Sequence, residues 1–333
     1  MVDLRSDTVT RPTAAMRAAM FAAPLGDDVF GDDPSVNALQ ADLAERLGFE
    51  AGLLMPSGTQ SNLCALMAHC QRGDEYIVGQ LAHCYRWEAG GAAVLGSIQP
   101  QPIAHQSDGS LALSDIEAAI KPDDAHFART RLLALENTLG GKVLSLSYLQ
   151  AACALAAKHG LARHLDGARL FNAAVALPGD PYANAKAICE PFDSVSVCFS
   201  KGLGAPVGSV LCGSRDFIAA ARRWRKMAGG GLRQAGLLAA AMQFGLDHHV
   251  HRLADDHALA RQLAAGLAPY LEIEPPETNI VFADGAPAGL MEHLKAQGVL
   301  VTGLYRLRFV THLDVDAEGV ARAVEVVRSF FKA

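Results

Sequence analysis

Two segments decide the expected fold: His164-Leu165-Asp166-Gly167-Ala168-Arg169 and Ser196-Val197-Cys198-Phe199-Ser200-Lys201-Gly202. Each resembles a buried strand that ends on an ionisable side chain. Because open α/β sheets bind ligands at the carboxyl ends of their strands, Asp166 and Lys201 are expected at such an edge. Taken singly, Asp166 could simply pair with Arg169, and Lys201 could be solvated at the rim. Their order, an aspartate followed 35 residues later by a lysine, favours a ligand site.

A third segment, Pro56-Ser57-Gly58-Thr59, lies between a predicted strand, 51–55, and a predicted helix, 61–69. Hydroxyls and a glycine at a helix N-terminus offer free N–H groups and a positive dipole end to phosphate, although an ordinary helix cap has the same composition. A phosphate cup, an aspartate and a lysine in this order are expected of a pyridoxal phosphate enzyme with the aspartate aminotransferase-like fold. No G-x-G-x-x-G motif supports a nicotinamide cofactor.

Short apolar runs alternate with helical patterns along most of the chain, which predicts an α/β fold with a mostly parallel central sheet and helices on both faces. After residue 253 the rhythm changes to short helices and strands. We therefore expect a large cofactor-binding domain at residues 1–253, N-terminal arm included, and a small C-terminal α/β domain at 254–333.

Composition excludes several classes of protein. The 333 residues carry 29 Lys and Arg against 35 Asp and Glu, a net charge of −6, so nucleic acid is not an expected partner. No apolar run reaches the ~18 residues that cross a bilayer, and the N-terminus lacks a signal-peptide pattern. The seven cysteines are scattered without C-x-x-C spacing, which argues against a disulfide framework or a zinc site. A cytoplasmic protein without a membrane partner is expected.

Several longer motifs carry a resemblance that spans essentially the whole chain. They are LRSDTVTRP (4–12), GDDVFGDDP (26–34), PSGTQSN (56–62), HLDGAR (164–169), FSKGLGAPVGS (199–209), RWRKMAGGGLRQAG (223–236) and RFVTHLD (308–314). Together they resemble the low-specificity L-threonine aldolases, fold-type I pyridoxal phosphate lyases. The family cleaves L-threonine, L-allo-threonine and related β-hydroxy-α-amino acids reversibly to glycine and an aldehyde.

The resemblance implies how pyridoxal 5′-phosphate is held. Lys201 matches the lysine that forms the Schiff base, and Asp166 matches the partner of the pyridine nitrogen. Ser57, Gly58 and Thr59 match the phosphate cup. Arg233 matches an arginine that reaches the phosphate of a neighbouring subunit, which implies a dimer with shared active sites, doubled to a tetramer.

The resemblance also implies which groups handle the substrate. Ser6, Arg169 and Arg308 match the groups that bind the substrate carboxylate, and Arg169 also matches a contact to the ring 3′-oxygen. His83 matches the residue stacked on the pyridine ring, and His126 matches a second histidine near the β-hydroxyl. Imidazole titrates in the range that removal of the hydroxyl proton requires, so the base is His83, His126 or a water held by both.

Other patterns limit this interpretation. His248, His249 and His251 lack metal-site spacing and indicate a solvated helix end, and no metal site is expected. Phe30, Trp87 and Leu139 depart from the family pattern, which leaves the threonine or allo-threonine preference open. The alternatives are an aminotransferase or β-eliminating lyase of the same fold, and a non-catalytic cofactor-binding protein.

Overall fold

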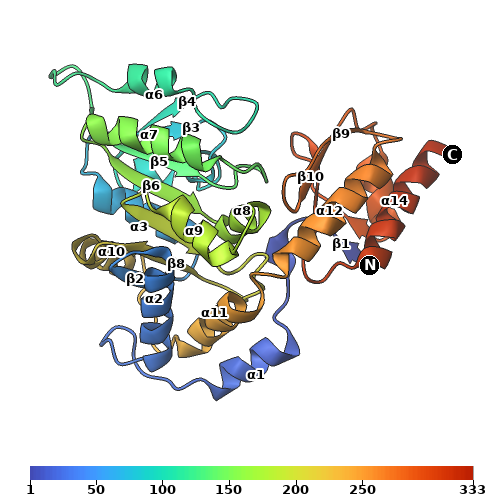
Figure 1. The fold of residues 1–333 in the computed structure, drawn as a ribbon, viewed down its shortest axis with the longest axis horizontal. Helices are drawn as coiled ribbons and strands as arrows, with labels where there is room; N and C mark the ends of the chain where they lie inside the picture. Colours follow the sequence, from blue (N-terminus) through green and yellow to red (C-terminus); the bar gives the residue numbers. More distant parts are fainter. Residues whose placement is uncertain (333) are drawn as a thin grey trace.

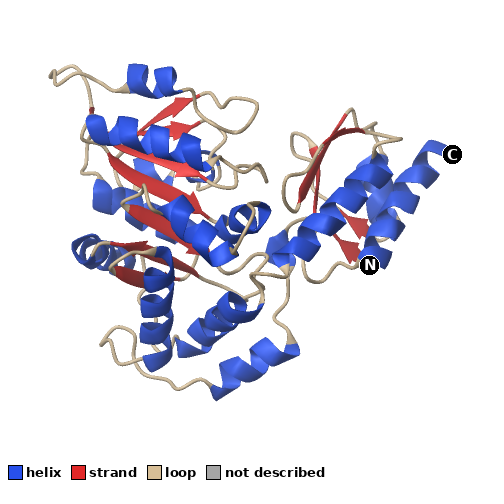
Figure 2. Cartoon of the chain, viewed as in Figure 1, coloured by secondary structure: helices blue, strands red, loops and turns tan. Residues whose placement is uncertain are grey.

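The computed structural model describes residues 1–332. Its main feature is a seven-stranded sheet with the order β2-β8-β7-β6-β5-β3-β4 (Figures 1 and 2). The strands are β2 (Ala51–Met55), β3 (Asp74–Gly79), β4 (Gln99–Ile103), β5 (Arg129–Glu136), β6 (Ala162–Gly167), β7 (Ser194–Cys198) and β8 (Ser209–Gly213). β8 runs antiparallel to both of its neighbours, β2 and β7, and all other pairs of strands in this sheet are parallel. The prediction of a mostly parallel sheet is therefore confirmed.

Helices cover both faces of this sheet. They are α1 (Ala14–Ala22), α2 (Pro34–Leu47), α3 (Gly58–His69), α4 (His83–Arg86), α5 (Gly91–Val94), α6 (Leu113–Ala119), α7 (Leu146–Lys158), α8 (Leu170–Ala176), α9 (Pro181–Cys189), α10 (Arg215–Met227) and α11 (Gly236–His248). Alternation along β2 shows the two layers. Leu53 and Met55 pack with α3 and α10, whereas Leu54 joins the core on the opposite face with α2 and α7.

The C-terminal part forms a second, smaller unit with its own hydrophobic core. It contains α12 (Leu253–Leu267), β9 (Glu272–Glu274), β10 (Ile280–Asp284), α13 (Leu290–Ala296), β11 (Val299–Leu300), β12 (Leu307–Val310) and α14 (Ala317–Lys332). The first strand, β1 (Val2–Asp3), pairs with β11, so the beginning of the chain packs in this unit (Figure 1). The division at residues 253 and 254 stays a prediction.

Local sequence accounts for the boundaries that matter to the site. The predicted strand Ala51–Met55 has its predicted bounds. The helix after it begins at Gly58 rather than at residue 61, because Ser57 caps it by accepting a hydrogen bond from the backbone N–H of Gln60 at 3.2 Å. Among the described residues, no helix is long and apolar enough to cross a membrane. All seven cysteines are buried and free of disulfide bonds.

Candidate active site

The carboxyl ends of the central strands bring the candidate residues together. Asp166 is the penultimate residue of β6, and Lys201 follows the end of β7, the neighbouring strand. On the other side, the register of β5 pairs Glu136 with Asp166. Asp166 is buried and Lys201 is half-buried. One edge of the sheet thus carries two carboxylates and one amine.

Asp166 is held by neutral donors and not by a cation. Its Oδ2 accepts a hydrogen bond of 2.7 Å from the Nδ2 group of Asn62, and its Oδ1 accepts one of 3.0 Å from the backbone N–H of Ala168. The possible ion pair with Arg169 is absent, because that guanidinium binds Asp7. Asp166 therefore keeps lone pairs available for a further donor.

His83 is oriented by two carboxylates. Its Nδ1 lies 2.9 Å from Oε1 of Glu88, and its backbone N–H donates to Oε2 of Glu136 at 2.7 Å. A carboxylate accepts only, so Nδ1 carries the proton in this contact and Nε2 is not used by it. The hydrogen bond to Glu88 raises the pKa of His83, although burial opposes the change.

Three carboxylates crowd this corner of the site. Burial raises the pKa of Glu88, although the hydrogen bond from His83 opposes the shift. Burial and the neighbouring Asp166 carboxylate raise the pKa of Glu136. His83, Glu88 and Asp166 offer ligand atoms within 4.8 Å of one another, but both acidic residues already accept hydrogen bonds from Asn62. The cluster is a hydrogen-bonded network of His83, Glu88, Asp166 and Asn62.

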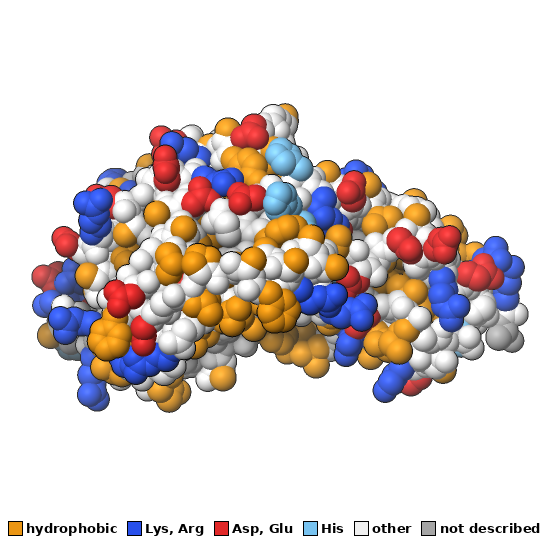
Figure 3. All heavy atoms as spheres, turned by 90° about the horizontal axis from the view of Figure 1, so that it is seen from below, with side chains coloured by type: hydrophobic (Ala, Val, Ile, Leu, Met, Phe, Trp, Pro, Cys, Tyr) orange, Lys and Arg blue, Asp and Glu red, His pale blue; other side chains and the backbone are white. Residues whose placement is uncertain are grey.

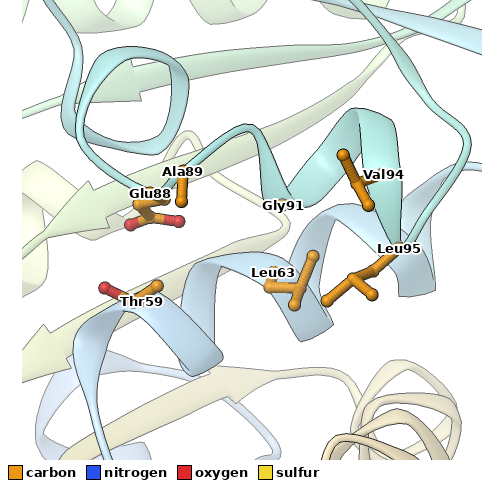
Figure 4. A pocket seen from close by; sticks show the side chains of 7 residues that line it. All are labelled: Thr59, Leu63, Glu88, Ala89, Gly91, Val94 and Leu95. Atoms are coloured by element: carbon orange, nitrogen blue, oxygen red, sulfur yellow. The ribbon is translucent and has the colours of Figure 1, made fainter.

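The residues predicted to form the phosphate cup lie at the N-terminus of α3, whose first N–H groups have no partners within the helix. A Cβ atom on Gly58 would lie 2.6 Å from the sulfur of Cys198, so only glycine lets the helix approach β7 this closely. A cavity of about 280 Å³ opens beside this N-terminus (Figure 4). Thr59 and Glu88 form its polar end, and Leu63, Val94 and Leu95 form its apolar end.

A buried ion pair connects the N-terminal arm to the segment between β6 and α8. Arg169 donates to both oxygens of Asp7, with Nε–Oδ2 at 2.8 Å and Nη2–Oδ1 at 2.7 Å. Asn279 donates to Asp7 as well, at 3.2 Å. Burial alone would raise the pKa of Asp7, but the Arg169 guanidinium outweighs it and lowers that pKa. Asp7 was not predicted as a site residue, although it lies beside Ser6 in the motif LRSDTVTRP.

Arg308 and Ser6 lie next to this pair. The Nη2 group of Arg308 donates to the carbonyl oxygen of Arg5 at 3.1 Å, while its buried Nε has no partner among the described residues. Burial lowers the pKa of Arg308, and the nearby Arg169 guanidinium lowers it further. Two neighbouring guanidinium groups with an unsatisfied donor suit an incoming carboxylate.

Two predicted residues are not brought to this corner. Arg233 is exposed and binds Asp27, with Nη1–Oδ2 at 3.2 Å. His126 lies on an exposed loop, where its Nδ1 contacts Asp124 at 2.6 Å. At about 3.3 Å per residue, the eight-residue strand β5 separates its start at Arg129 from Glu136 by roughly 23 Å. His126, which precedes β5, is therefore far from Asp166 of the same chain.

The structure also places the histidines of the predicted helix end and the three residues that depart from the family pattern. His249 is buried and its Nδ1 lies 2.8 Å from the carbonyl oxygen of Leu203, so the prediction of a solvated helix end is wrong for this residue. Phe30 is exposed and Leu139 is buried. The ring of Trp87 meets Tyr305 of the C-terminal unit edge-on, with centroids 6.2 Å apart.

Comparisons with known proteins agree on the family. The beta-eliminating lyase family matches residues 3–286. A low specificity L-threonine aldolase of Escherichia coli is 53% identical over 334 residues, covering 99% of both chains. A low-specificity L-threonine aldolase of Arabidopsis thaliana is 42% identical, covering 96% of this chain and 93% of its own.

Solved structures share the fold. A threonine aldolase of Leishmania major superposes with a TM-score of 0.85 at 23% identity, covering 99% of both chains. A serine palmitoyltransferase of Sphingomonas wittichii gives 0.77 at 19% identity, covering 99% of this chain and 87% of its own. These similarities confirm the predicted fold class.

Proposed function

Because this chain belongs to the beta-eliminating lyase family and to the low-specificity L-threonine aldolases, we propose that it cleaves L-threonine, L-allo-threonine and related β-hydroxy-α-amino acids to glycine and an aldehyde. Pyridoxal 5′-phosphate is its proposed cofactor. The observation that carries the proposal is the position of Asp166 and Lys201 on adjacent strand ends, beside a helix N-terminus.

The residues present fit this cofactor. Asp166 is a buried anion with free lone pairs, which suits a protonated pyridine nitrogen. The N-terminus of α3 suits the phosphate, and Lys201 would hold the aldehyde carbon through its Nζ. When bound, the cofactor supplies an electron sink for the bond that breaks at the substrate Cα.

The other residues position the substrate and move its proton. Arg169, Arg308 and Ser6 would bind the carboxylate and thereby decide which Cα substituent stands perpendicular to the ring. In an aldolase this substituent is Cβ, and the β-hydroxyl must lose its proton. The free Nε2 of His83 suits that task directly or through water, because Glu88 holds the ring and favours its charged form.

The reaction is tested with the four stereoisomers of threonine. We expect glycine and acetaldehyde from L-threonine or L-allo-threonine, with pyridoxal phosphate and without a 2-oxo acid. The D-isomers should react poorly, because the carboxylate contacts would turn Cβ away from the required position. Consumption of a 2-oxo acid without release of an aldehyde would instead favour an aminotransferase, and release of ammonia would favour a β-eliminating lyase.

The protein is proposed to be a homo-oligomer with shared sites. Seen from below, so that α1 faces the viewer, the surface carries many apolar side chains across its middle (Figure 3). Large apolar side chains are exposed on and around α1 and at the end of α10: Phe21, Leu25, Phe30 and Met227. Such a surface favours contact with a second copy. Arg233 is proposed to contact the phosphate bound by the neighbouring subunit. The protein is also proposed to be cytoplasmic.

His126 would serve the site of a partner subunit, since about 23 Å of strand separates it from the site of its own chain. Mixing the inactive variant Lys201→Ala with His126→Ala should then restore activity after subunit exchange, because one hybrid site contains both an intact lysine and an intact histidine. Alone, His126→Ala should lower kcat by ~10²–10⁴ if His126 is the base.

A second mixture serves as the control for a residue that acts in the site of its own chain. His83 is expected in the same site as Lys201 of its own chain, so mixing Lys201→Ala with His83→Ala should restore nothing. Hybrids that form, shown by mass spectrometry of tagged subunits, but show no recovery with His126→Ala would contradict a role in the partner's site.

A further inference from the structure

We propose that Asn62 is a positioning residue, whose single amide group holds Asp166, the partner of the cofactor nitrogen, and Glu88, the partner of His83. The inference rests on the proposed cofactor site. It gives a role to the last residue of the motif PSGTQSN, for which the sequence predicted none, and it links Asp166 to Glu88.

The two hydrogens of the Asn62 amide match two carboxylates. Nδ2 lies 2.7 Å from Oδ2 of Asp166 and 2.9 Å from Oε1 of Glu88. All three residues are buried, and the carboxylates come from different elements: the end of β6 and the segment after α4. An amide nitrogen has two N–H bonds, so both are used and neither carboxylate is left without a donor.

A chain of hydrogen bonds fixes the orientation of this amide. The Oδ1 of Asn62 lies 3.2 Å from Nε2 of His164, whose Nδ1 lies 2.8 Å from Oγ of Ser194. The same Oγ lies 2.7 Å from Nε2 of His69. Burial lowers the pKa of His164 to about 3 and that of His69 to about 4, so both rings are neutral near pH 7.

Because both histidine rings are neutral, the hydrogen bonds from His69 to Asn62 run in one direction. A neutral imidazole carries one N–H, and Oδ1 can only accept, so His164 donates from Nε2 and its Nδ1 accepts from the Ser194 hydroxyl. The hydroxyl oxygen in turn accepts from Nε2 of His69. A flipped Asn62 would turn its oxygen toward two carboxylates, which only accept hydrogen bonds, so the contacts to Asp166 and Glu88 would both be lost.

Asn62 therefore supports two groups of the site at once, Asp166 and Glu88. Asn62 donates one hydrogen bond to Asp166, which keeps further lone pairs for the cofactor nitrogen. The same amide holds Glu88 in the position where its carboxylate accepts a hydrogen bond from the Nδ1–H of His83. The residue that binds the cofactor ring and the residue that orients the candidate base therefore depend on one amide. His164 acts only through Asn62, since it contacts neither carboxylate in the described network.

The test measures the dissociation constant for pyridoxal phosphate by equilibrium dialysis of the full chain. Asn62→Ala should weaken binding about ten- to a hundredfold, the effect of losing hydrogen bonds to charged groups. His164→Leu should weaken it in the same direction, whereas His164→Gln should retain near-wild-type affinity because its amide can still donate to Asn62. The melting temperature identifies any variant that fails to fold.

Ser61→Ala is the matched control. Ser61 lies next to Asn62 on α3 and accepts a buried hydrogen bond of 2.7 Å from Ser196, without touching Asp166 or Glu88. It should bind the cofactor within about threefold of wild type. Wild-type affinity in folded Asn62→Ala, an equal loss in Ser61→Ala, or equal affinities of the two His164 variants would overturn the inference. A wild-type chain that binds no pyridoxal phosphate would instead refute the proposed function.

Discussion

Replacing Lys201 with alanine should abolish covalent attachment of pyridoxal phosphate and lower kcat for L-threonine cleavage by ~10⁴-fold or more, the scale seen when a covalent catalytic group is deleted. Lys201 lies beyond the end of β7, next to the strand that carries Asp166. It lies at the strand edge that also holds the carboxylates of Glu136 and Asp166.

The attachment is measured by borohydride reduction of the wild-type protein with its cofactor, followed by peptide mass spectrometry. The cofactor mass should lie on the peptide that contains Lys201 and disappear in Lys201→Ala. Lys158→Ala serves as the control, because Lys158 is an exposed lysine paired with an exposed Glu117. Labelling of another lysine in the wild type, or unchanged activity of Lys201→Ala, would exclude Lys201 as the attachment point.

Sequence periodicity was enough to predict the sheet and its ligand-binding edge. Buried strands appear as short apolar runs, and an ionisable residue at the end of such a run stands out, as Asp166 and Lys201 do. The segment 234–253 shows the limit, because its Ala- and Leu-rich pattern alone predicts one long helix. It is interrupted after α11, although no glycine or proline marks the break within 246–253. At the break, residues contact parts of the chain that are distant in sequence; for example, Nδ1 of His249 lies against the carbonyl oxygen of Leu203.

The unpredicted site residues have a common physical origin. Each has a partner far along the chain: Glu88 lies 26 residues from Asn62, and Asp7 lies 162 residues from Arg169. None of the three lies at the end of an apolar strand run. A helical asparagine or a loop glutamate has the same local pattern whether it faces solvent or a buried partner. The spacing of Gly58 and Asn62 by four residues on α3 is the one signal that places Asn62 on the face of the cup.

Asp7→Asn should lower the free energy of unfolding by about 3 kcal/mol at pH 7, because it removes one member of a buried ion pair and leaves the charge of Arg169 uncompensated. Asp7 is fully buried, and it joins the N-terminal arm to Arg169 at the start of α8 and to Asn279 of the C-terminal unit. Urea unfolding measures the loss. Glu325→Gln makes the same charge change in an exposed pair with Arg328 and should cost ~0.5 kcal/mol or less.

The pH dependence of this difference identifies its source. Burial opposes ionisation of Asp7, but Arg169 prevails and lowers the pKa of the folded protein below the unfolded value of about 4. A carboxyl whose folded pKa is depressed stabilises the protein in full above its unfolded pKa. The difference between wild type and Asp7→Asn should therefore stay constant from pH 8 to 5 and decrease as the pH falls below about 4. A difference that instead decreases between pH 8 and 6 would assign the stabilisation to a group other than Asp7, since a carboxyl with a lowered pKa does not titrate there.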